Sequence, residues 1–155
     1  MKKQNIFVKV SGDLFNSPDF LKELKVIELH SLYLAICVGG GTQINAALVQ
    51  AGFELGEHGP LGRGLRTTEE RRIAKGVLYK NCTELKNLLD TASVTAELLV
   101  PIFESGPVMC HVNGDQYVRT MYNGFDRLYI FTTNDRVAKK VREFENLPKV
   151  RIVGL

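Results

Sequence analysis

The sequence lacks the features that mark secreted and membrane-spanning proteins. It has only three cysteines in 155 residues, Cys37, Cys82 and Cys110, and they lie far apart in apolar or helical surroundings. Neither a disulfide framework nor a zinc site is therefore expected, and reduced thiols fit a cytoplasmic protein. No apolar run approaches the length of about 20 residues that crosses a bilayer, so no membrane segment is expected.

The sequence also lacks a strong excess of charge of either sign. Its 20 basic residues are interspersed with 17 acidic ones, and the net charge is only +3. DNA binding calls for a basic face with aromatic platforms, so we expect no DNA partner. The start MKKQN runs into IFVKVSGD, which places a lysine and an aspartate where a secretory signal peptide has its apolar segment. We therefore expect a cytoplasmic protein.

What the sequence does contain is typical of one soluble α/β domain spanning residues 1–155. The apolar fraction is 45% and the charged fraction 24%, which is enough for one hydrophobic core. Strand-like and helix-like segments alternate through nearly the whole chain, with no internal repeat and no low-complexity tract. This alternation predicts a mostly parallel sheet with helices on both faces.

The stretch LYLAICVGGGTQINAALVQ, residues 32–50, is the centre of this pattern. Its apolar first half predicts a buried strand, and the second half has apolar residues at helical spacing. Between them, Gly39, Gly40 and Gly41 form a turn that a ligand can approach closely. We expect Thr42 to cap the helix, whose N-terminus would favour an anion such as phosphate. The named nucleotide-binding motifs are not matched, so a plain strand-to-helix turn stays an alternative.

A second strand is predicted at residues 5–10, with Lys9 near its carboxyl end, where open α/β sheets bind ligands. A lysine that reaches from the strand end to water is the alternative. Ser17, Pro18 and Asp19 then have the pattern of a helix start, and the helix is expected to end near His30.

The stretch GFELGEHGPLGRGLRTT, residues 52–68, has five glycines and no period, which indicates a functional or mobile loop. His58, Arg63 and Arg66 are its candidates for contact with an anionic substrate, although each alone also fits a solvated loop residue. A long amphipathic helix is predicted at residues 68–91, because acidic residues fill its first turn and apolar residues follow at helical spacing.

The second half of the chain predicts strands at residues 97–105 and 107–115, joined through residues 105–107. Asn113 to Asp115 read NGD, which is a hairpin-turn signal, but the following residues suit a helix ending near Gly124 as well as a strand. A short buried strand at residues 128–132, a helix at residues 136–146 and a last strand at residues 150–153 complete the pattern.

Three motifs, in order, resemble the amino acid kinase superfamily, which includes UMP, acetylglutamate and aspartate kinases. The first is VKVSGD, a strand ending in a lysine and a glycine turn, and the second is VGGGTQI, which is similar to the glycine run of UMP kinases. The third is VNGDQYVRTMYNGFDRLYIFTTND, an acidic element that leads a helix and then a strand. The resemblance covers residues 5 to about 135.

This resemblance implies a three-layer αβα sandwich and transfer of the ATP γ-phosphoryl group, with Mg²⁺, to a nucleoside monophosphate or a carboxylate. In the family pattern Lys9 matches the lysine that contacts the transferring phosphoryl group, and Asp115 matches the acidic residue that organises the site. The implied substrate- and phosphate-binding residues are Gly12, Gly39, Gly40, Gly41 and Arg63.

Family members continue into a nucleotide-binding lobe where this chain has TTNDRVAKK and then one more helix and strand. The resemblance therefore implies a shortened lobe. Lys139 and Lys140 are candidates to replace the family's second lysine, but nothing in their spacing shows that either does. A catalytically inactive kinase-like protein that binds a nucleotide or another anion is the alternative, and a macromolecular partner is a third possibility. We also expect a homo-oligomer, because the helices at residues 19–29 and 69–89 can pack against copies of themselves.

Overall fold

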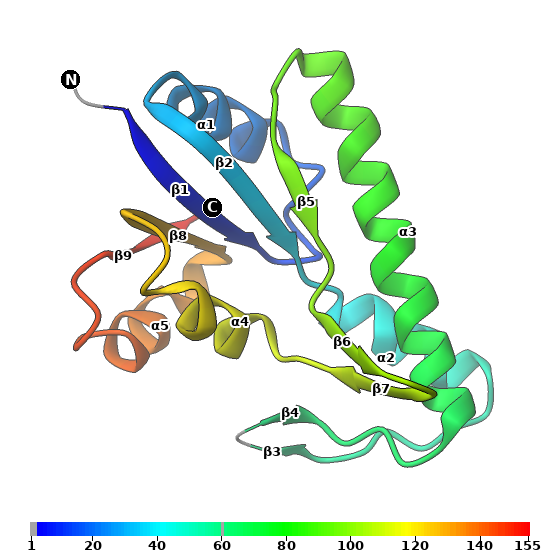
Figure 1. The fold of residues 1–155 in the computed structure, drawn as a ribbon. Coiled ribbons are helices and arrows are strands. Elements are labelled where there is room, and N and C mark those ends of the chain that lie inside the picture. The colour runs from blue at the N-terminus through cyan, green and yellow to red at the C-terminus, as the bar shows by residue number, and fades with distance from the viewer. Residues whose placement is uncertain (1–2, 60) are drawn as a thin grey trace.

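In the computed structural model, which describes residues 3–59 and 61–155, five parallel strands form the central sheet (Figure 1). Residues 1–2 and residue 60 lie outside the described residues. The sequence prediction about a signal peptide concerns residues 1–2, and residue 60 belongs to the glycine-rich stretch. The strand order is β5-β2-β1-β8-β9. The strands are β1 Gln4–Val10, β2 Ser31–Val38, β5 Glu97–Leu99, β8 Arg127–Thr132 and β9 Val150–Gly154.

Helices cover both faces of this sheet, as the alternation of segments predicted. Helices α1 (Pro18–Leu29) and α3 (Thr68–Ala92) lie on one face, and α4 (Gly114–Met121) and α5 (Val137–Glu143) lie on the other. Because side chains alternate along a strand, Val8 of β1 packs in the core under α1 and α3, whereas Phe7 packs under α4. The predicted three-layer αβα sandwich is therefore confirmed.

One part of the chain lies beyond the end of the sheet (Figure 1). There, α2 (Gly41–Gln50) packs against α3 through Ile44, Leu48, Ala74 and Leu78. Two antiparallel hairpins complete this part, namely β3 (His58–Gly59) with β4 (Gly62–Arg63), and β6 (Ile102–Ser105) with β7 (Val108–His111).

Several local predictions are confirmed and others are wrong. Ser17 caps α1 and Pro18 opens it, as expected. Of the strands predicted at residues 97–105 and 107–115, only the first part, β5, joins the central sheet. The rest forms the β6–β7 hairpin outside the sheet, which turns at Gly106 with φ of 56°. The predicted loop at residues 52–68 contains the β3–β4 hairpin. The helix predicted at residues 136–146 is a 3₁₀ turn, Asn134–Arg136, followed by α5.

Two helix starts also differ from expectation. Thr42 does not cap α2, because the helix already begins at Gly41 with Gly40 in the capping position. The hairpin reading of the NGD stretch is wrong too: Asn113 caps α4, and its side-chain oxygen accepts a hydrogen bond of 2.9 Å from the Asp115 N–H. The family pattern, in which an acidic residue leads a helix, describes this segment better than the turn signal does.

The topology places a crevice at the carboxyl end of β1. The chain leaves β1 through α1 on one face to reach β2, and it reaches β8 through α4 on the opposite face. Connections that diverge to opposite faces on the two sides of a strand open a crevice at its carboxyl end, and open α/β sheets bind ligands there.

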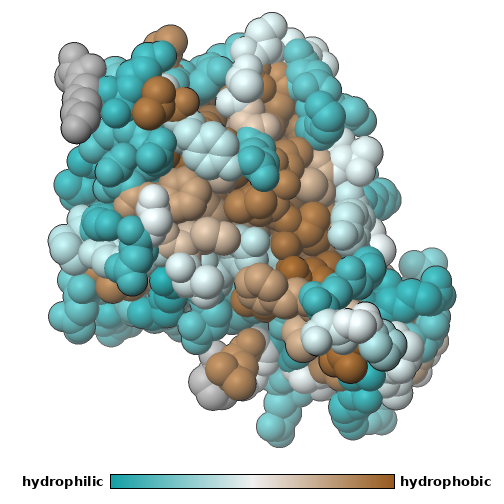
Figure 2. Space-filling model, in the orientation of Figure 1, coloured by the Kyte–Doolittle hydropathy of each residue, from teal (hydrophilic) through white to brown (hydrophobic). Residues whose placement is uncertain are grey.

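Apolar side chains form a band down the middle of the face shown in Figure 2. Aromatic pairs run through the α4 side of the sheet, where Tyr33 stacks on Phe125 and Phe103 stacks on Tyr117. Tyr33 and Phe103 remain about half exposed, at 42% and 51%. None of the described helices is both long and apolar enough to cross a membrane.

Helix α1 offers a matched test of the core under the sheet. Leu24 is fully buried and Leu29, on the same helix, is 72% exposed. We expect Leu24→Ala to lower the free energy of unfolding by about 2–5 kcal/mol, because it leaves a cavity in the core. Leu29→Ala should change it by no more than about 0.5 kcal/mol. Urea unfolding of both variants measures this, and equal effects would contradict the placement of α1.

Candidate functional site

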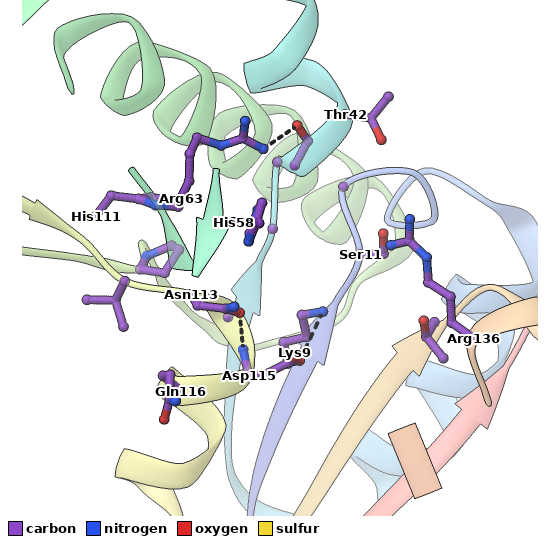
Figure 3. A pocket seen from close by; sticks show the side chains of 18 of the residues that line it. Lys9, Ser11, Thr42, His58, Arg63, His111, Asn113, Asp115, Gln116 and Arg136 are labelled. Atoms are coloured by element: carbon purple, nitrogen blue, oxygen red, sulfur yellow. Dashed lines mark hydrogen bonds and ion pairs between the residues drawn. The ribbon is translucent and has the colours of Figure 1, made fainter. Parts of the chain in front are cut away.

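A cavity of about 580 Å³ lies at the carboxyl end of β1 (Figure 3). Its wall is formed by the turns after β1 and β2, by the β3–β4 hairpin, by the start of α4, and by α5. Every residue of the predicted site lines it: Lys9, Gly12, Gly39, Gly40, Gly41, Arg63 and Asp115. The structure thus brings together residues that are up to 106 positions apart in the sequence, and their roles toward a substrate remain predictions.

The turns after β1 and β2 are bonded to each other. The Gly39 N–H donates to the Val10 carbonyl at 2.9 Å, and the side-chain amide of Gln43 donates to the Gly12 carbonyl at 2.7 Å. The Thr42 hydroxyl donates to Asp13 at 3.0 Å. A Cβ on Gly12 would stand 2.7 Å from the Gly39 carbonyl oxygen, so only glycine fits this close approach.

Asn81 supports the glycine turn from below and was not identified from the sequence. It lies on α3, is only 4% exposed, and donates from its side-chain amide to the Gly39 carbonyl at 2.9 Å. The signal was present, because Asn81 occupies an apolar-stripe position between Leu78 and Leu85. A polar residue in such a position is expected to have a specific hydrogen-bond partner.

Asp115 joins two lysines that come from distant parts of the chain. Its carboxylate lies 3.7 Å from the Lys9 ammonium and 2.5 Å from that of Lys140, which also contacts Glu143 at 2.6 Å. Burial by itself would raise the pKa of Asp115, but the positive charges of Lys9 and Lys140 outweigh it and hold that pKa below its ordinary value. Burial likewise opposes the charge of Lys140, yet its carboxylate partners keep its pKa raised.

The side chain of Lys9 is enclosed and does not extend freely to water. It is 13% exposed, and a Cβ on Gly114 at the start of α4 would stand 2.9 Å from the Lys9 Cε. The first turn of α4 therefore covers the lysine stem and directs the ammonium group toward Asp115. The alternative of a lysine that reaches to bulk solvent is not what the structure shows.

Arg63 lies across the cavity from Lys9 (Figure 3). Its guanidinium donates to the side-chain oxygen of Asn45 and, at 3.2 Å, to the Gly41 carbonyl, which fixes it beside the glycine turn. His58 and His111 line the same side of the cavity. Arg66, the third candidate of the glycine-rich stretch, is exposed and does not line it.

Positive charge dominates the cavity wall. Six described lining residues are Lys or Arg, against three carboxylates, although the whole chain is nearly balanced. Those outside the predicted site, Arg119, Arg136, Lys139 and Lys140, lie on α4, α5 and the turn before α5. The site is therefore suited to an anionic ligand with more than one negative charge.

The residues present fit phosphate groups better than a metal held by the protein. Among the described residues, no group of three or more His, Cys, Asp or Glu is arranged to hold a metal ion. Mg²⁺ needs carboxylates that are free to bind it, whereas Asp115 contacts two lysines and Asp13 accepts from Thr42. The described wall contains no Phe, Tyr or Trp side chain, so its aromatic rings are the imidazoles of His58 and His111.

Comparison with known proteins gives the fold. No protein-family model and no curated protein sequence matches the chain. Among solved structures, it is similar to N-acetylglutamate synthase from Neisseria gonorrhoeae in complex with coenzyme A and N-acetyl-glutamate, with a TM-score of 0.55 and 12% sequence identity. The match covers 87% of this chain and 43% of that one, so this chain corresponds to less than half of that protein.

This similarity establishes an amino acid kinase-like fold. At 12% identity it does not carry an activity over to this chain. The ligands of the similar structure are coenzyme A and N-acetyl-glutamate, so binding of ATP and Mg²⁺ by this chain rests on the sequence resemblance alone.

Asn81 offers a test of the support beneath the glycine turn. We expect Asn81→Ala to lower the free energy of unfolding by about 1–3 kcal/mol, because it leaves the Gly39 carbonyl without its partner. The same change at the exposed Asn87, on the same helix, should cost no more than about 0.5 kcal/mol. Urea unfolding compares the two variants, and an unaffected Asn81→Ala would mean that the hydrogen bond does not hold the turn.

Proposed function

We propose that this chain is a phosphotransferase of the amino acid kinase type. The observation that carries the proposal is the placement of Lys9, Asp115 and Lys140 beside two linked glycine turns, at the carboxyl end of the central strand. Phosphoryl transfer depends mainly on positioning and on positive electrostatics around the transferred group. Lysine ammonium groups and the free N–H groups at the start of α2 supply both kinds of contact.

In the proposed reaction an acceptor oxygen attacks the γ-phosphorus of ATP, and the bond from that phosphorus to the ADP oxygen breaks. Lys9 would contact the oxygens of the transferred group, and Asp115 would keep Lys9 and Lys140 oriented toward it. The glycine turn would let the phosphoryl group approach the backbone closely. Mg²⁺ is expected to arrive with the nucleotide, because this ion usually binds through substrate phosphates and one or two carboxylates.

A nucleoside monophosphate is the proposed acceptor, as in UMP kinases, and Arg63 would contact its phosphate. The similarity of the VGGGTQI run to UMP kinases and the position of Arg63 beside the Gly41 carbonyl support this choice. A carboxylate acceptor is the other possibility within the family. The excess of Lys and Arg in the wall favours the more highly charged phosphate.

A catalytically inactive anion-binding protein is the second candidate, and one observation favours it. Lys9 and Lys140 contact Asp115 and Glu143, and Lys139 also pairs with Glu143, so two carboxylates offset two of the three positive charges in this cluster. A phosphoryl group must compete with the carboxylates for the lysines. In a binding protein the same cluster would only help to shape the cavity.

The homo-oligomer expected from the sequence is also a proposal. The outer surface of α1 exposes Val26 and Leu29, at 52% and 72%, and α3 exposes Tyr79 at 48%. Such side chains can pack against a second copy of the chain. Sedimentation velocity at micromolar concentration should show a species larger than the monomer, and a monomer alone would remove the proposal.

Lys9→Met tests the kinase proposal directly. We expect it to reduce ADP formation from Mg·ATP at least about 100-fold, because the variant keeps the side-chain length but loses the charge at the phosphoryl site. The control is Lys3→Met, which changes an exposed lysine just before β1 and should leave the rate unchanged. The assay includes UMP, CMP, AMP and N-acetyl-glutamate as acceptors, and the unfolding of each variant is measured in parallel.

The outcome separates the two candidate functions. Loss of turnover with stability kept within about 1 kcal/mol supports the kinase. No ADP formation by the unmodified chain with any acceptor, together with a thermal shift on adding ATP or UMP, would point to the binding protein. Equal loss of stability and turnover in Lys9→Met would assign Lys9 a structural role.

A further inference from the structure

Arg63, His58 and His111 form a corner of the cavity across from Lys9 (Figure 3). His58 pairs with Arg63 across the β3–β4 hairpin, so their side chains lie on the same face of that ribbon. Gly62, with φ of 112°, sits so close to Asn113 that a Cβ on it would stand 3.0 Å from the Asn113 Cβ. This contact places the hairpin over the junction between β7 and α4, and so next to His111.

The corner has buried polar atoms without partners. Among the described side chains, Arg63 Nε and His111 Nδ1 are both shielded from solvent and make no hydrogen bond. A buried donor or acceptor without a partner typically costs about 1–3 kcal/mol, and such groups usually mark a place that a ligand or water fills. One of these atoms belongs to the Arg63 guanidinium and the other to the His111 ring, so both can donate to a group that has several acceptor oxygens.

The two groups whose charges act on His111 both lie on the β3–β4 hairpin. Burial is the main reason why the pKa of His111 falls to about 4, and the charges of Arg63 on β4 and His58 on β3 lower it further. On the α4 side, Asp115 lies four residues away along the chain and already contacts Lys9 and Lys140. His111 is therefore neutral near pH 7 until a negative charge enters the corner.

We propose that Arg63, His58 and His111 bind the doubly charged phosphate of a phosphomonoester, and that the two histidines select it over a carboxylate. A carboxylate brings one negative charge, which Arg63 alone can balance. A phosphate monoester brings between 1.5 and 2 charges near pH 7 and three acceptor oxygens, so it gains from two further donors, roughly as a phosphorylated side chain does. The inference rests on the proposed function, for which it names the residues that distinguish a phosphate acceptor from a carboxylate one.

Proton uptake follows from this arrangement. The phosphate charge offsets the repulsion from Arg63 and between the histidines, so it favours their protonated forms. Because a protonated histidine donates from both ring nitrogens, His111 would then use Nδ1, which has no partner in the empty corner. Binding should therefore raise the pKa of His111 from about 4 toward its ordinary value of 6.5.

Histidine NMR tests this with few signals, because the chain has only three histidines. His30, the third, caps the C-terminus of α1 at the start of β2, about 26 Å from the glycine turn along eight strand residues, and serves as an internal reference. Ring signals are followed from pH 4 to 8 with inorganic phosphate, with acetate, and with chloride at matched ionic strength. Phosphate should shift His58 and His111 and raise their pKa values, while acetate and chloride should not.

Variants identify the contacts. Arg63→Gln should abolish the phosphate effect on both histidines. His111→Gln should lower the affinity for phosphate about tenfold while changing that for acetate less than about threefold, since only the dianion uses the second donor. A phosphate effect no larger than that of chloride, an equal effect on His30, or acetate bound as tightly as phosphate would overturn the proposal.

The same measurements separate this inference from the proposed function. In Lys9→Met the phosphate effect on His58 and His111 should persist although turnover is lost. Phosphate binding at the corner in a chain without turnover would leave the inference standing and remove the kinase. Turnover with a carboxylate acceptor, together with no phosphate effect on the histidines, would support the kinase and overturn the inference.

Discussion

The contact of Asp115 with Lys9 and Lys140 is the interaction on which the arrangement of the site depends. It ties the first strand to the start of α4 and to α5, three elements that are far apart in the sequence. Lysines at the protein surface usually extend into water, and an ion pair that is exposed there contributes little to stability. Here both lysines are only 13% exposed, so the shared carboxylate decides where their charges lie.

The connections of the sheet explain why this contact forms at the carboxyl end of β1. Helix α1 leaves on one face and α4 approaches on the other, so the two loops diverge there and leave room for a cavity. The two turns then pack closely together, because a side chain on Gly12 would clash with the Gly39 carbonyl oxygen. The topology of the sheet therefore provides the cavity, and the lysines at the same place favour the binding of anions there.

Local sequence signals predicted the elements of the sandwich well and the contacts between elements less well. The Ser17–Pro18 start and the apolar strand before Gly39 depend on neighbouring residues, so they can be found in the sequence. The family resemblance placed Lys9 and Asp115 in one site, where the structure also brings them together. The role of Asn81 depends on α3 crossing beneath the glycine turn, and spacing alone does not reveal that.

The two sides of the cavity differ in how their positive charge is balanced. On one side Lys9 and Lys140 contact Asp115 and Glu143, and Lys139 also lies near Glu143, so three ammonium groups are paired with two carboxylates before a ligand arrives. On the other side Arg63 is held by the neutral groups of Asn45 and Gly41, and its charge remains available. An anion can therefore use the Arg63 guanidinium without displacing a carboxylate. A group placed near Lys9, in contrast, must displace Asp115 from that lysine or add negative charge beside it.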